Sequence, residues 1–199
     1  EAWVNAIYAW RENPRHDLSQ LPTLVVESLP PSAFDRLFAH IAKAQQYVMD
    51  QWSDTFVRDW ASARDEHAAM RVLMASRVVM ARRLQLAGHP GLPEVVRREF
   101  TEGVARDVRK LQKDLEDLAV RQSGYRIDRA GIERSLNLLR ANRLTAILEP
   151  GFPLQALIEG RLDTTPLPVP TVATASESRP TPDQELPPRR KYRAIIIDN

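Results

Sequence analysis

A change of composition just after Gly160 is the feature that most constrains the fold of this chain. Before it, apolar residues recur at helical spacing. After it, residues 161–188 contain no glycine and seven prolines, which favour extended polyproline-like chain over a packed core. We therefore expect a helical bundle over residues 1–160, a flexible proline-rich linker over residues 161–188, and a terminal interaction peptide over residues 189–199.

The bulk composition limits the class of protein. The whole chain has 43% hydrophobic and 27% charged residues, as soluble globular proteins do, and a body of about 160 residues can bury about two thirds of its unfolded surface. The chain has no cysteine, which excludes disulfides and thiolate sites and predicts a reducing cytoplasm, such as that of a bacterium. No apolar run approaches the roughly 18 residues that span a bilayer, so we expect no membrane-spanning segment and no membrane partner. Because the first residue is Glu1 and not methionine, a trimmed or internal fragment is a further expectation.

Two helices are expected near the start of the chain. Trp3, Ile7 and Trp10 share one face of a short helix that ends before Asn13. A second helix begins with Ser32 as its N-cap and carries an apolar stripe up to Val48. Between them, Leu24 to Val26 is the only plausible extended piece.

A long helical hairpin is the strongest prediction. Apolar residues alternate spacings of four and three from Phe56 to Leu84, which predicts one central helix over residues 55–87. Gly88 is a natural left-handed terminator, and a second arm over residues 93–122 follows after a very short loop. Two long helices so connected should be antiparallel.

The remaining helices complete an all-α bundle. Asp128 is expected to cap a helix that ends at Pro150, and a last turn over residues 153–159 stops at Gly160. The apolar seam of the second arm covers little more than two heptads. Packing inside the bundle is therefore the first interpretation, and homo-oligomerisation through this hairpin as a coiled coil is the second.

His67 is the first place to look for a metal ligand or an acid–base group. Metal sites in helical bundles use Glu and His three residues apart, whereas Glu66 is adjacent and Arg64 stands three positions before. The heptad places His67 on the packing seam, which predicts a hydrogen-bonded core histidine. The sequence also has no G-x-G phosphate loop and no glycine-flanked serine turn. We expect no enzyme, no metal and no cofactor.

A row of cations on the second arm is the best electrostatic feature. Arg106, Arg109, Lys110 and Lys113 fall at i, i+3, i+4 and i+7, and we call these four residues the basic ridge. Arg97 and Arg98 extend the row towards the N-terminus, and Arg121, Arg126, Arg129 and Arg134 form a second cluster. Such a ridge can contact phosphates of DNA or RNA. The alternative is a solvated face neutralised by the helical pairs Glu102–Arg106, Asp107–Lys110 and Lys110–Asp114, and the modest net charge of +2 favours this second interpretation.

The terminal peptide has the composition of a strand. In an extended chain, Tyr192, Ala194 and Ile196 would alternate in direction with Arg193, Ile195 and Ile197. The run of β-branched residues from Ile195 to Ile197 is typical of strands. One hypothesis is that this segment adds to the sheet edge of a protein partner or of another subunit. The alternatives are the first strand of a following domain and a strand that pairs with residues 24–26.

These observations predict a non-enzymatic helical adaptor or structural subunit of a larger cytoplasmic assembly. The bundle face and the terminal peptide would bind separately, with the linker raising their effective concentration. A nucleic-acid-binding accessory protein that uses the basic ridge, with Arg97 and Arg98, is the alternative function.

Overall fold

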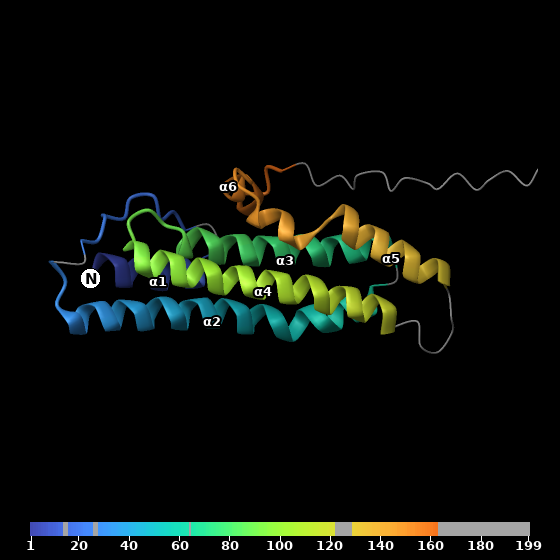
Figure 1. Ribbon diagram of the computed structural model, residues 1–199, viewed down its shortest axis with the longest axis horizontal. Coiled ribbons are helices and arrows are strands. Elements are labelled where there is room, and N and C mark those ends of the chain that lie inside the picture. The colour runs from blue at the N-terminus through green and yellow to red at the C-terminus, as the bar shows by residue number, and fades with distance from the viewer. Residues whose placement is uncertain (14–15, 26–27, 64, 122–128, 163–199) are drawn as a thin grey trace, which may run out of the picture. The chain divides into compact units, whose positions relative to one another are not determined.

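The computed structural model describes residues 1–13, 16–25, 28–63, 65–121 and 129–162. Figure 1 shows them as a helical bundle, which confirms the predicted fold class. The elements are α1 (Ala2–Glu12), α2 (Pro31–Ser62), α3 (Glu66–Ala87), α4 (Glu94–Arg121), α5 (Arg129–Ala141), the 3₁₀ helix η2 (Leu144–Leu148) and α6 (Leu154–Ile158).

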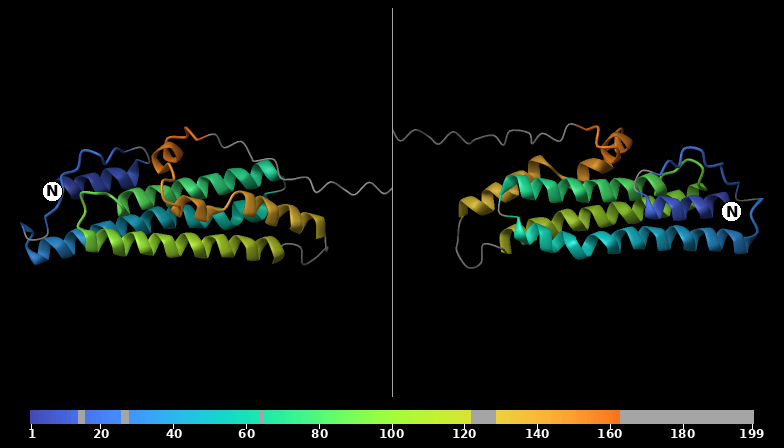
Figure 2. Two further views of the ribbon diagram at one scale, coloured as in Figure 1. Left: turned by 45° about the horizontal axis from the view of Figure 1, so that its top comes forward. Right: turned by 180° about the vertical axis from the view of Figure 1, so that it is seen from behind.

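The predicted antiparallel hairpin is formed by α3 and α4, and α3 is the central helix. It packs against α2 and α4 and also contacts α6, η2 and α5, and Figure 2 shows α2 and α4 running alongside it. Gly88 ends α3 as predicted, but with a φ of −88° it is not in the left-handed conformation that the sequence suggested. The carbonyl of Pro93 accepts the first backbone bond of α4, from the Arg97 N–H at 2.9 Å.

The single long helix predicted over residues 55–87 is wrong. α2 continues to Ser62, Ala63 is extended, and Asp65 starts α3 by accepting a 2.7 Å hydrogen bond from the Ala68 N–H. The reversal brings Trp60 of α2 and Met70 of α3 into one core. A continuous helix would hold these side chains apart along its axis, so burial of both favours the break.

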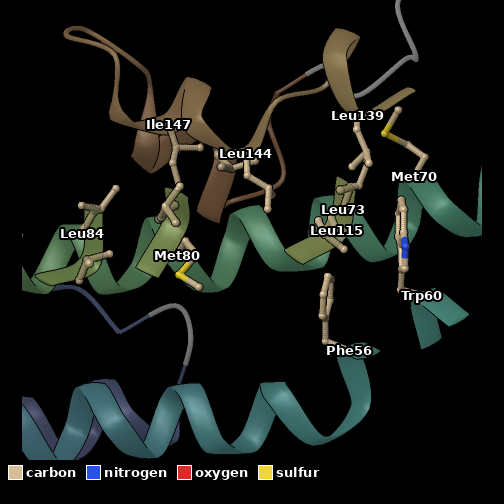
Figure 3. Close-up of a cluster of buried hydrophobic side chains, with 14 of the residues drawn as sticks. Phe56, Trp60, Met70, Leu73, Met80, Leu84, Leu115, Leu139, Leu144 and Ile147 are labelled. Carbon is tan, nitrogen blue, oxygen red and sulfur yellow. The ribbon is translucent and has the colours of Figure 1, made fainter. Parts of the chain in front are cut away.

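Two clusters of buried apolar side chains hold the bundle together. The larger joins α2, α3, α4, α5, η2 and α6, and Figure 3 shows Phe56, Leu73, Leu115 and Leu139 meeting within it. The smaller cluster packs α1 against α2 and the start of α4, with Trp3, Ile7 and Trp10 buried as the sequence predicted.

Two other predicted boundaries are corrected by the structure. The helix expected to run to Pro150 ends at Ala141, because Arg143 is not helical, with a ψ of 129°, and Leu144 starts a separate 3₁₀ helix. Pro30, and not Ser32, is the N-cap of α2, with Pro31 at its first position, where a missing N–H has no cost. Gly160 does stop the last helix, with a φ of +71° that favours glycine.

Candidate nucleic-acid interface on α4

α4 has one face in the core and one face in solvent. Its buried side chains are Val96, Val104, Val108, Gln112, Leu115 and Ala119. All four residues of the basic ridge are exposed. The helical period that places the apolar residues in the core also places the cations on the opposite side.

The helical ion pairs expected to neutralise the ridge are not formed. Within the described ranges, no carboxylate lies within ion-pair distance of Arg106, Arg109, Lys110 or Lys113. Asp107, the expected partner of Lys110, instead accepts from Arg83 of α3, with 2.8 Å between Oδ2 and Nη2. The prediction that these three helical pairs form is therefore wrong.

Arg83 is the centre of a buried polar network that joins three helices. Its Nε donates to Gln45 Oε1 of α2 at 2.8 Å, and Gln45 Nε2 donates back to the Arg83 carbonyl at 2.9 Å. Only 8% of the Arg83 side chain is exposed, against 43% for Asp107. A buried guanidinium without a counter-charge costs several kcal/mol, whereas a surface helical pair gains under about 1 kcal/mol. The network therefore determines where the Asp107 carboxylate lies.

A groove of about 300 Å³ lies next to the ridge. Arg106 lines it together with Phe38, Gln45, Arg83, Phe100, Gly103 and Asp107. A Cβ on Gly103 would lie 3.8 Å from Arg106 Nη2, so the guanidinium lies back along α4 over this glycine. The Phe38 and Phe100 rings meet each other at 4.7 Å between centroids. The groove is thus lined by one ridge cation, Arg106, by the carboxylate of Glu99 and by an aromatic pair in its wall.

The structure separates Arg97 from the other predicted cations. Arg97 is half-buried and pairs with Glu94 one turn before it. Arg98 is exposed, as are Arg121, Arg129 and Arg134 near the junction of α4 and α5. Arg126 lies outside the described residues. The four ridge residues are therefore the continuous part of the basic surface.

Two further arginines of α3 act as structural ties, Arg82 from a buried position and Arg77 from a half-buried one. Arg82 Nη2 donates to the Trp10 carbonyl at 2.7 Å, and its guanidinium carbon lies 5.1 Å from the Trp10 ring centre. Arg77 Nη2 donates to the Arg143 carbonyl at 2.8 Å. Burial lowers the pKa of both guanidinium groups by disfavouring the charged form. The sequence pattern did not separate these arginines from the surface ones. Its position did distinguish Arg77, which falls on the predicted apolar seam of α3.

The histidines are placed differently from the prediction. His67 is exposed in the first turn of α3, because the break at residues 63–65 removes the continuous seam on which its expected burial depended. His89 is the buried histidine, with its Nε2 bonded to the Leu18 carbonyl at 2.8 Å and its Nδ1 accepting from the Gly91 N–H at 3.0 Å. Among the residues that the structure describes, no group of three His, Asp or Glu side chains could hold a metal ion.

Two larger hollows lie at the α1 end of the bundle. One of about 800 Å³ is lined by Trp3, Leu24, Leu37 and His40, among others. The other, of about 760 Å³, includes Asp17, Gln85, Gln155 and Glu159. Its polar side chains contact neighbours already: Gln85 with Gln155, Asp17 with Ser19, and Glu159 with Arg161. These contacts show how the hollow is built but indicate no particular ligand.

The terminal peptide lies outside the described residues, and so do its predicted contacts at Tyr192, Arg193, Ile195, Ile196 and Ile197. Val26 of the expected extended piece is also outside them. Leu24 is described, and its N–H donates to the Gly91 carbonyl at 2.7 Å, which ties this segment to the α3–α4 loop.

In the described ranges, no helix is both long enough and apolar enough to cross a bilayer. Comparison with protein-family models, with curated proteins and with solved structures finds no match to this chain.

Proposed function

We propose that this protein is a non-enzymatic adaptor whose helical body binds nucleic acid through the basic ridge of α4. The observation that supports this proposal is that none of the four ridge cations forms an ion pair with a carboxylate in the described part of the chain. Four cations that share one exposed helical face and form no ion pair there can attract the phosphates of a nucleic-acid backbone.

The spacing of the ridge suits a duplex backbone. Arg106 and Lys113 are seven positions apart, which corresponds to about 10 Å along a helix. The phosphates of one strand recur every 3.4 Å along a duplex axis, so the ridge spans roughly three base pairs. Contacts of this kind position a protein on the duplex without reading its sequence. We therefore expect binding that is sensitive to salt and indifferent to base sequence.

The second contact of the adaptor is the terminal peptide. We assign residues 189–199 to a protein partner on the strand-like pattern of their sequence, with Ile195 to Ile197 as the apolar part. The proline-rich linker, residues 161–188, keeps the two binding segments on one chain. Linking them raises the effective concentration of each partner near the other.

Fluorescence anisotropy with a labelled DNA duplex tests the nucleic-acid contact. The full chain is titrated at several salt concentrations, and four phosphate contacts predict a log–log salt slope of about −3 to −4. In the double variant Arg109→Glu/Lys113→Glu, the magnitude of that slope should fall by about two. Arg71→Glu, an exposed arginine on α3, is the matched control and should leave it unchanged. A wild-type chain that does not bind, or an equal loss in the control, would reject this function.

A pull-down from nuclease-treated lysate tests the protein contact separately. The full chain is compared with Ile196→Asp, which places a charge inside the apolar run. Val169→Asp in the linker is the control. A partner retained by the control and lost by Ile196→Asp supports the terminal contact, and equal recovery in all three chains rejects it.

A further inference from the structure

The charge of the basic ridge depends on a residue that lies outside α4. Asp107 directly follows Arg106 and stands three positions before Lys110, so on an isolated helix its carboxylate neighbours Lys110. In the folded chain the Asp107 carboxylate is bound to Arg83 of α3. One carboxylate that would reduce the charge of the ridge is thereby engaged elsewhere.

Arg83 is itself fixed in place. Its Nε and its carbonyl are both bonded to the Gln45 amide, and only 4% of Gln45 is exposed. These two bonds use the oxygen and the nitrogen of that amide, so the guanidinium is held between α2 and α4. Because Arg83 cannot follow Asp107 towards solvent, Asp107 must lie towards Arg83 to make the ion pair.

We propose that Arg83 is a positioning residue for the basic ridge, and that it preserves the ridge's charge towards nucleic acid by holding the Asp107 carboxylate away from Lys110. This inference rests on the proposed function. In the folded chain the Asp107 carboxylate pairs with Arg83 and with no ridge cation. Releasing it would cancel one cation and so remove about one phosphate contact.

The salt slope of duplex binding by the full chain measures this effect. Asp107→Asn should leave the slope unchanged, because the carboxylate that it removes is already engaged and Asn retains an oxygen that can accept from Arg83. Asp114→Asn is the matched comparison, since Asp114 is an exposed carboxylate at i+4 from Lys110 and has no ion pair in the described ranges. It should strengthen binding.

Arg83→Met releases Asp107. It should make the salt slope shallower by about one, with affinity at 0.1 M salt falling on the order of tenfold. The double variant Arg83→Met/Asp107→Asn should recover the wild-type slope, because no carboxylate is left to move. Arg83→Lys retains a cation for Asp107 and should keep the slope of the wild type. Far-UV circular dichroism establishes that each variant is folded.

Two results would overturn the role of Arg83 while leaving the proposed function intact. One is a slope that steepens by about one in Asp107→Asn, which would mean that Asp107 neutralises the ridge in the folded chain. The other is a folded Arg83→Met chain with the wild-type slope. If Arg83→Met does not fold, Asp107→Asn alone decides the question. A wild-type chain without salt-dependent binding rejects the proposed function itself, so the two failures are distinct.

Discussion

The rings of Trp3 and His89 meet edge to face, with their centroids 5.0 Å apart and their planes at 85°. Trp3 lies in α1 and His89 in the α3–α4 loop, so this contact joins the first helix to the turn of the hairpin. The Trp3 indole also donates to the Pro22 carbonyl at 2.8 Å, and Gly91 lies between the two rings and that carbonyl. The close approach of these groups leads to the first prediction.

Gly91→Ala should destabilise the protein by about 1–3 kcal/mol. A Cβ at this position would lie 2.9 Å from Trp3 Cζ2 and 3.0 Å from the Pro22 carbonyl oxygen, which is a backbone atom. Gly103→Ala on α4 is the opposite case, because a Cβ there meets only Arg106 Nη2, at an ordinary contact distance of 3.8 Å. This variant should stabilise the helix by about 0.5–1 kcal/mol. Thermal unfolding of both variants checks the pair, and equal effects would contradict this account.

Asp65→Ala should destabilise the start of α3 by about 0.5–2 kcal/mol, because it removes the acceptor of the Ala68 N–H. Asp65→Asn keeps an acceptor at the same position and should unfold close to the wild type. Urea titration followed by circular dichroism measures both. If Asp65→Ala is as stable as the wild type, the Asp65 cap does not determine where the chain turns from α2 to α3.

Gln112→Leu should destabilise the protein by about 1–3 kcal/mol, although it places an apolar residue in a buried position. Gln112 Oε1 accepts the Leu144 N–H at 2.8 Å, and leucine would leave that N–H buried without an acceptor. Glu116→Gln is the control, because it preserves a hydrogen-bond acceptor for Gln112 Nε2. Chemical denaturation should place this control within about 0.5 kcal/mol of the wild type.

Ser19→Ala should raise the pKa of Asp17. The Ser19 backbone N–H and then its hydroxyl hold the pKa of this carboxyl below its ordinary value, each through a 2.8 Å hydrogen bond. Alanine removes only the hydroxyl bond, so the pKa should rise part of the way. Because the folded-state pKa is depressed, the linked stability is present above the unfolded-state value and is lost as the pH falls through the folded value. An NMR titration that finds the same Asp17 midpoint in both chains would rule out the hydroxyl contribution.

The sequence by itself determined the helical class, the hairpin and the burial of several residues. The Trp3, Ile7 and Trp10 face and the seam from Val104 to Leu115 follow directly from helical spacing, because a 3.6-residue period places these side chains on one side. Short-range signals also located the turn at Gly88 and the stop at Gly160.

Only the tertiary structure decided where the helices break and which charges remain free. Residues 55–87 fit a helical period throughout, yet the chain reverses at Ala63, because burying Trp60 and Met70 in one core outweighs local continuity. The pairing of Asp107 with Arg83 likewise joins positions that are distant in sequence, so no spacing rule within α4 could predict it. Helical period acts between near neighbours along the chain, whereas burial and ion pairing depend on which helices pack together.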